Sequence, residues 1–201
     1  MKQLVRIINF LVTLILGLTC LTAPLVNAEA NEKTEKIEKL VEQQRHISKI
    51  LGISLVIVEK GETVYQRNFG YKNVKEKTPV TSNTLFEIGS TTKAFTGLAI
   101  LRLEKEGKLK RSDSVHKYIP WFKLKYQGEP QTITLNQLLY HSSGIASKSI
   151  AQIPESTASN ALELNVKTLL NQELNRKPGS TFEYATINYD VLGLVIENVT
   201  K

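Results

Sequence analysis

The chain has 201 residues, of which 41% are hydrophobic and 22% are charged, and its formal net charge is +7. This length and apolar fraction are sufficient for one globular domain with a substantial core. No basic run carries interleaved aromatic residues, which argues against a nucleic-acid partner. The modest positive excess favours contact with an anionic surface such as a cell envelope, although most lysines are expected simply to face solvent.

Residues 1–30 are predicted to be a secretory signal peptide and not part of the fold. Lys2 and Arg6 form a short basic start, and a mainly apolar segment follows them. Two small-x-small cleavage sites come next, at residues 26–28 and 28–30. An uncleaved membrane anchor is the alternative, because the apolar segment is nearly long enough to span a bilayer.

Cysteine and histidine usage narrows the class of protein further. The only cysteine, Cys20, lies inside the predicted signal peptide, so the mature chain forms no disulfide. An exported protein without disulfides is typical of a bacterial exterior, and we expect a secreted or cell-envelope-associated, extracytoplasmic protein. The three histidines, His46, His116 and His141, are scattered without metal-ligand spacing, so we expect no metal and no cofactor.

The mature chain is predicted to begin with a helix and a β-hairpin. Residues 31–50 place apolar side chains at helical spacing. Residues 53–58 and 63–71 are rich in β-forming residues, with a turn at 59–62 between them. A lone two-stranded sheet is marginal in water, and the loop expected at 72–83 supplies no obvious third strand.

The remainder is predicted to be mainly helical, which gives a mixed α and β fold class. A long apolar helix starts near Ser90 and ends near Glu106, with Gly107 as its C-terminal cap. The further predicted elements are, in chain order, a loop with Pro120 and Trp121, a short helix from a Thr134 cap to Leu139, an irregular segment at 146–159, a helix at 161–172, a turn at Pro178 and Gly179, an extended segment at 181–184, and a helix from Tyr189 to about Val199.

Ser90 and Lys93 are a candidate nucleophile and base. Their three-residue spacing places both side chains on one helix face, with Cβ atoms about 5–6 Å apart. A serine hydroxyl needs an adjacent base, and lysine can serve only if its pKa is lowered. Burial in an apolar helix and the positive end of the helix dipole would both lower it. Because Ser-x-x-Lys alone is a weak motif, the alternative is a capping Ser90 and a solvated Lys93.

Four stretches, in this order, carry a resemblance to a known family: residues 86–93, 138–145, 177–179 and 182–193. Together they resemble the serine β-lactamase-related family, which includes class C β-lactamases, low-molecular-weight penicillin-binding proteins, D-Ala-D-Ala carboxypeptidases and esterases. The resemblance runs from about Glu35 to the last residue. It implies a β-lactamase/transpeptidase-like fold, in which helices flank an antiparallel sheet and form a further subdomain.

The resemblance also implies residue roles. Ser90 matches the acyl-accepting nucleophile, Lys93 matches the base, and Tyr184 matches a tyrosine that relays protons to the leaving group. Thr186 and His141 match substrate-binding positions, and for His141, at the edge of the site, we expect a structural role. The alternative for Tyr184 is a half-buried core tyrosine.

Thr186 departs from the family pattern, in which Tyr-x-Asn places a carboxamide at this position. A threonine hydroxyl is shorter and lacks the paired donor and acceptor of an amide. Recognition of a peptide or β-lactam amide is therefore weakened, and an ester substrate gains support. Asn188, two residues on, is expected to cap the last helix.

The family's third motif, Lys-Thr-Gly or His-x-Gly on a later strand, does not occur before Lys201. That strand supplies an oxyanion-hole donor, and one such donor is worth about 3–4 kcal/mol. We therefore expect residues 31–201 to be an incomplete domain, the N-terminal part of a family member that lacks the C-terminal strands.

Two functions stay open at this point. One is an exported serine hydrolase that forms an acyl-enzyme with a β-lactam, a D-Ala-D-Ala-type peptide or an ester. The other is a truncated, inactive remnant that only binds cell-wall peptide or a partner chain. The expected partners are a small-molecule or peptidoglycan-peptide substrate, the cell-envelope surface and a complementing C-terminal chain.

Overall fold

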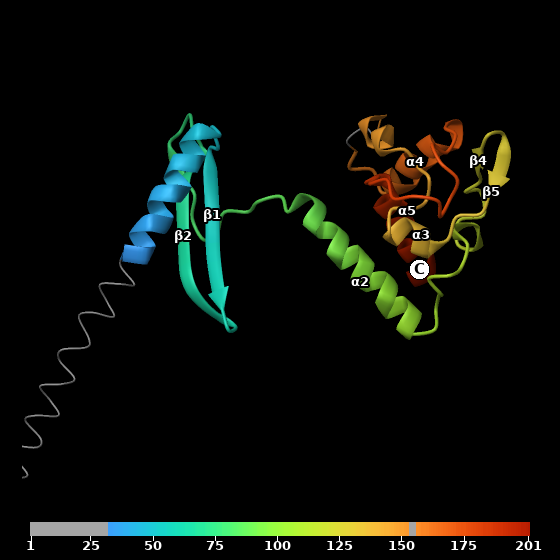
Figure 1. The fold of residues 1–201 in the computed structure, drawn as a ribbon, viewed down its shortest axis with the longest axis horizontal. Coiled ribbons are helices and arrows are strands. Elements are labelled where there is room, and N and C mark those ends of the chain that lie inside the picture. Colours follow the sequence, from blue (N-terminus) through green and yellow to red (C-terminus); the bar gives the residue numbers. More distant parts are fainter. Residues whose placement is uncertain (1–31, 153–155) are drawn as a thin grey trace, which may run out of the picture. The chain divides into compact units, whose positions relative to one another are not determined.

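A computed structural model describes residues 32–152 and 156–201 and divides the chain into two compact units (Figure 1). The first unit ends at Phe86, and the second is Glu87–Lys201. The signal peptide predicted for residues 1–30 lies outside the described residues. Among the residues that are described, none of the helices is both long enough and apolar enough to cross a membrane.

The first unit contains a helix, which covers residues 32–47, and a three-stranded antiparallel sheet in the order β1–β2–β3. The strands are β1 (Gly52–Glu59), β2 (Glu62–Asn73) and β3 (Thr78–Pro79). The β1–β2 hairpin confirms the two predicted strands. The expectation that the segment 72–83 is only a loop is wrong, because β3 lies in it and pairs with β2. This strand was missed because two residues are too few to show an alternating pattern.

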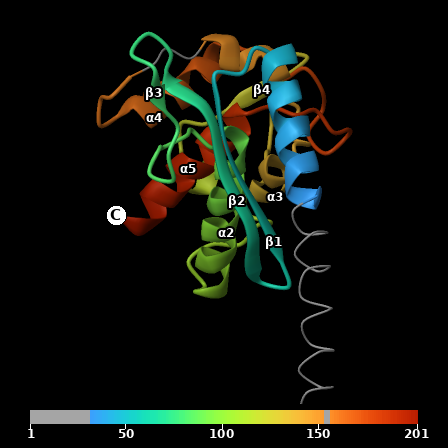
Figure 2. The same ribbon diagram turned by 90° about the vertical axis from the view of Figure 1, so that its left-hand side faces the viewer.

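Alternating burial along β1 shows that the hairpin has one covered face. Ile53, Leu55 and Ile57 are half-buried, whereas the residues between them are exposed, as expected for period-two alternation. The preceding helix runs alongside the hairpin in Figure 2. There, Arg67 Nε on β2 donates to Glu38 Oε1 at 2.9 Å, so an ion pair links the helix to the sheet.

The second unit is mainly helical. Its elements are η1 (Gly89–Thr91), α2 (Thr92–Lys105), η2 (Val115–Lys117), β4 (Leu124–Tyr126), β5 (Glu129–Gln131), α3 (Leu135–Leu139), η3 (Ser147–Gln152), α4 (Ala161–Lys167), η4 (Thr168–Asn171) and α5 (Ile187–Thr200). The predicted helices are confirmed in kind and order. The β4–β5 hairpin was not predicted, because its strands of three residues are too short to give a pattern.

Helix α5 lies at the centre of the core of the second unit. Its Ile187, Val191, Leu192 and Val195 side chains are fully buried. Helices α2, α3 and α4 all pack against α5. Removal of these apolar side chains from water is the main stabilising contribution, at about 1.5–3 kcal/mol for each fully buried residue.

Within the second unit, helix α2 is covered on one side. Ile100 and Leu103 are buried, but Phe95 and Leu98 are each 63% exposed. The elements that pack against α2, chiefly α5, cover one side of it.

Helix α3 begins with the predicted cap and ends at the loop that carries His141. Thr134 Oγ1 accepts from the Gln137 backbone N–H at 3.2 Å, and Gln137 Oε1 accepts from the Thr134 N–H at 2.9 Å. This reciprocal capping box satisfies donors that the first turn cannot pair internally. His141 then takes a positive φ of 52°, which turns the chain out of the helix.

The loop after α3 is held against the segment that precedes α5. The Asn175 N–H donates to the Gly144 carbonyl at 2.8 Å, and the Glu183 N–H donates to the His141 carbonyl at 2.8 Å. Gly144 has a φ of +83°, and a Cβ placed on it would lie 2.1 Å from the Arg176 carbonyl oxygen. Glycine is therefore required at this point for both conformation and space.

We expect Gly144→Ala to lower the free energy of unfolding by about 3–4 kcal/mol, because it adds a backbone clash to the cost of a left-handed conformation. The matched control is Gly128→Ala, since Gly128 has a similar φ of +81° but open space around it. The control should lose only about 1–2 kcal/mol. Urea denaturation measures both variants. Equal losses in the free energy of unfolding would contradict the close approach of Gly144 to the Arg176 carbonyl.

Candidate active site

Ser90 and Lys93 are brought together by one turn of chain. Ser90 lies in η1, directly before α2, and Lys93 lies in the first turn of α2. Lys93 Nζ donates to Ser90 Oγ at 3.1 Å. This hydrogen bond directs the amine at the serine, and Lys93 as a whole is half-buried. The spatial pairing therefore follows from the three-residue spacing.

Tyr184 reaches the same serine from the extended segment before α5. Its hydroxyl lies 3.0 Å from Ser90 Oγ, and Lys93 Nζ lies 5.3 Å from the centroid of its ring. Tyr184 is 42% exposed, which is unlike a core tyrosine. Hydrogen bonds from Lys93 and then from Ser90 lower the pKa of the Tyr184 phenol below its usual value. A phenol with a lowered pKa gives up its proton more readily.

A cleft of about 360 Å³ opens beside these groups, and Thr186 and Asp190 are part of its wall. Its lining residues are Gly89, Ser90, Thr92, Lys93, Thr96, Thr186, Tyr189 and Asp190. Thr186 therefore lies where it was expected, within the cleft that contains Ser90. Asp190 was missed, although it follows Thr186 by four residues and so shares its helix face. Burial raises the pKa of the Asp190 carboxyl, and the charge of Lys93 partly opposes this rise.

The ring of His141 packs against the ring of Tyr184, and His141 is not among the residues that line the cleft. It is 8% exposed, and its ring centroid lies 4.4 Å from that of Tyr184. His141 Nδ1 accepts from the Ala185 N–H at 3.2 Å, which places the proton of the neutral ring on Nε2. Burial, and then the charge of Lys93, lower the pKa of His141. Substrate contact by this residue stays a prediction.

Asn188 does not cap α5, so that prediction is wrong. The helix begins at Ile187, and its N-cap, Thr186, makes no capping side-chain hydrogen bond. Asn188 is fully buried instead. Its Oδ1 accepts from Ser143 Oγ at 2.8 Å, and its Nδ2 faces His141 Nδ1 at 3.2 Å. The helix starts two residues earlier than expected, which places Asn188 inside the helix, on its inward face.

The serine, lysine and tyrosine therefore meet at the start of a helix in a mixed α and β fold, with a buried polar network beneath them. A serine hydroxyl held beside an amine and a phenol in this way is an arrangement suited to a serine hydrolase. The family profile described as Beta-lactamase matches residues 37–201, so the chain belongs to the β-lactamase family. This match confirms the family resemblance and the β-lactamase/transpeptidase-like fold.

Individual relatives agree with the family match. The chain is 42% identical over 171 residues to Protein flp of Staphylococcus aureus (strain N315), an alignment that covers 85% of this chain and 34% of that protein. The structure of EstCE1, a hydrolase with promiscuous acyltransferase activity, matches with a TM-score of 0.73 and 27% identity, over 83% of this chain and 47% of that one.

The octameric penicillin-binding protein homologue from Pyrococcus abyssi matches with a TM-score of 0.71 and 35% identity. That match covers 83% of this chain and 39% of the archaeal chain. The chain therefore spans less than half the length of each of these three relatives.

We expect Asn188→Ala to lower the free energy of unfolding by about 2–4 kcal/mol, because it leaves the buried Ser143 hydroxyl without its acceptor and removes the amide that faces His141 Nδ1. The matched control is Asn198→Ala, since the hydrogen bonds of Asn198 are exposed: its Nδ2 donates to the Tyr118 carbonyl at 3.1 Å, and its Oδ1 accepts from Lys201 Nζ at 3.4 Å. The control should cost less than about 1 kcal/mol. Thermal and urea denaturation measure the difference, and similar losses for the two variants would refute the buried network.

Proposed function

We propose that this chain is an exported serine hydrolase that forms an acyl-enzyme at Ser90. The observation that carries the proposal is that Lys93 Nζ and the Tyr184 hydroxyl both lie within hydrogen-bond distance of Ser90 Oγ, at 3.1 and 3.0 Å. Membership of the β-lactamase family supports it, and the predicted signal peptide supports action outside the cytoplasm.

In the proposed acylation, Ser90 Oγ attacks the carbonyl carbon of the substrate, and its proton passes to the Lys93 amine, which acts as the base. The bond from the carbonyl carbon to the leaving group then breaks, and Tyr184 donates a proton to the departing atom. Lys93 returns the proton to Tyr184, so no proton is lost. The start of α2 favours the negative charge that develops on the carbonyl oxygen. A water molecule later hydrolyses the Ser90 ester by the same groups in reverse.

An ester is the substrate that we propose, in preference to a β-lactam or a peptide amide. Thr186 is in the cleft wall and offers one hydroxyl where a carboxamide would offer a paired donor and acceptor. An ester lacks the amide N–H that such a carboxamide would recognise. An ester substrate therefore loses less binding energy than an amide substrate when threonine stands in place of asparagine. The similarity to EstCE1, a hydrolase with acyltransferase activity, supports this choice.

Labelling with a fluorophosphonate or a fluorescent penicillin tests the nucleophile. We expect one covalent adduct on the parent chain, none on Ser90→Ala, and an unchanged adduct on Ser180→Ala, which alters an exposed serine. Tyr184→Phe should slow labelling about 100-fold, as for loss of a general acid or base. Mass spectrometry of the labelled peptide gives the site.

The absence of an adduct on the folded parent chain would refute the hydrolase proposal. It would favour the alternative, an inactive remnant that only binds cell-wall peptide or a partner. An adduct that forms only after addition of a polypeptide with the family's later strands would show that a complementing chain is needed.

Exchange of Thr186 for Asn tests the substrate class. We expect Thr186→Asn to raise the ratio of nitrocefin hydrolysis to 4-nitrophenyl acetate hydrolysis about tenfold, since one regained hydrogen bond is worth about 1 kcal/mol or slightly more. Thr186→Ser keeps the hydroxyl and is the control, for which the ratio should not change. A ratio that is the same in all three proteins would contradict the ester preference.

A further inference from the structure

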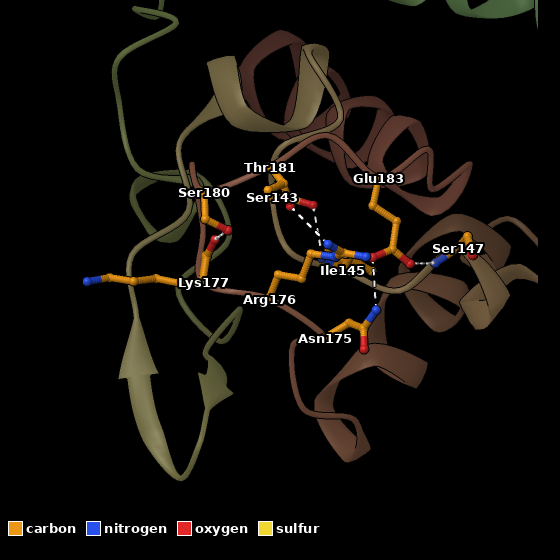
Figure 3. A network of polar contacts seen from close by, with 9 residues as sticks. All are labelled: Ser143, Ile145, Ser147, Asn175, Arg176, Lys177, Ser180, Thr181 and Glu183. Atoms are coloured by element: carbon orange, nitrogen blue, oxygen red, sulfur yellow. Dashed lines mark hydrogen bonds and ion pairs between the residues drawn. The ribbon is translucent and has the colours of Figure 1, made fainter.

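Glu183, the residue directly before Tyr184, ties three segments of the second unit together (Figure 3). Its carboxylate accepts from the Ser147 N–H at 3.0 Å, from Asn175 Nδ2 at 2.9 Å and from Arg176 Nε at 3.1 Å. Ser147 begins η3 in the loop region after α3, whereas Asn175 and Arg176 follow η4. One side chain therefore joins both loops to the segment that carries the phenol.

The charge of Glu183 is what allows it to hold three donors. A carboxylate has two oxygens that only accept, whereas a glutamine amide has one accepting oxygen. The hydrogen bond from the Ser147 N–H, followed by that from Asn175, lowers the pKa of Glu183. The group is therefore ionised at neutral pH, and Arg176 pairs with it in an ion pair whose carboxylate side chain is only 16% exposed.

The main chain around Tyr184 is fixed on both sides. The Glu183 N–H donates to the His141 carbonyl at 2.8 Å, and the Ala185 N–H donates to His141 Nδ1 at 3.2 Å. The Tyr184 ring itself is 42% exposed, so burial alone does little to fix its position. The position of the phenol therefore depends on how firmly its two neighbours in the chain are held.

We propose that Glu183 is a positioning residue that keeps the Tyr184 hydroxyl within hydrogen-bond distance of Ser90. Glu183 is not among the residues that line the cleft, so it acts through its neighbour and not on substrate. Its consequence for turnover rests on the proposed hydrolase function, but its effect on the phenol does not. The two ideas can therefore fail separately.

The titration of Tyr184 is the direct test. In chains labelled with ¹³C at the tyrosine ring, the signal that Tyr184→Phe removes identifies this residue by NMR. We expect Glu183→Gln to raise the pKa of Tyr184 towards that of a free tyrosine, because Lys93 and Ser90 no longer meet the phenol. The matched control is Glu163→Gln, which breaks an ion pair to Lys167 at 2.8 Å on α4 and should leave Tyr184 unchanged.

Kinetics supply the second readout. We expect Glu183→Gln to lower kcat for ester hydrolysis about 10- to 100-fold, the range for a small misplacement of a catalytic group, with little change in KM. Asn175→Ala and Arg176→Ala each remove one of the three contacts to Glu183 and should shift the pKa of Tyr184 in the same direction by less. These two variants serve as the test if Glu183→Gln does not fold, which circular dichroism reports.

Each outcome has a definite meaning. An unchanged pKa of Tyr184 in folded Glu183→Gln overturns the proposal, whatever happens to activity. If that variant unfolds, an unchanged pKa in both Asn175→Ala and Arg176→Ala overturns it as well. A raised pKa supports the positioning role. If the parent chain also forms no Ser90 adduct, the positioning role stands and the hydrolase proposal fails.

Discussion

The hydrogen bond between Ser90 and Tyr184 is the contact on which the rest of the site depends. Lys93 is close to Ser90 because of local helix geometry, and its place needs little from the remainder of the fold. Tyr184 is 94 positions away in the chain. Its hydroxyl lies 3.0 Å from Ser90 Oγ only because two loops and α5 are held in fixed positions relative to one another. The core that surrounds α5, and the polar network beneath it, therefore stabilise one long-range contact.

Two layers of residues hold Tyr184 in place for this contact. One layer is neutral, and the other is charged. The inner layer is buried and neutral, and consists of His141, Asn188 and Ser143. The outer layer is charged and nearer to solvent, and its centre is the Glu183 carboxylate. Buried hydrogen bonds between neutral groups do not weaken with salt, whereas an ion pair near the surface is partly screened. The two layers should therefore respond differently to ionic strength.

The sequence was informative where structure is local or strongly patterned. Helical spacing, the Thr134 cap and the hairpin turn were sufficient to predict most helices and strands. The three-residue spacing was sufficient to predict that the side chains of Ser90 and Lys93 meet. Sequence alone did not show β3 or the β4–β5 hairpin, whose strands have two or three residues. The inward role of Asn188 was also missed, because the helix starts two residues earlier than predicted, and such a shift changes the face on which a side chain lies.

The left-handed backbone of His141 has a consequence for any effort to make this protein more robust. A non-glycine residue at a φ of 52° stores about 1–3 kcal/mol of backbone strain. A glycine here would relieve that strain and is the kind of change that thermostability engineering selects. It would also remove the imidazole that stacks on the phenol and accepts the Ala185 N–H. At position 141, the stability of the backbone and the packing around Tyr184 therefore favour different residues.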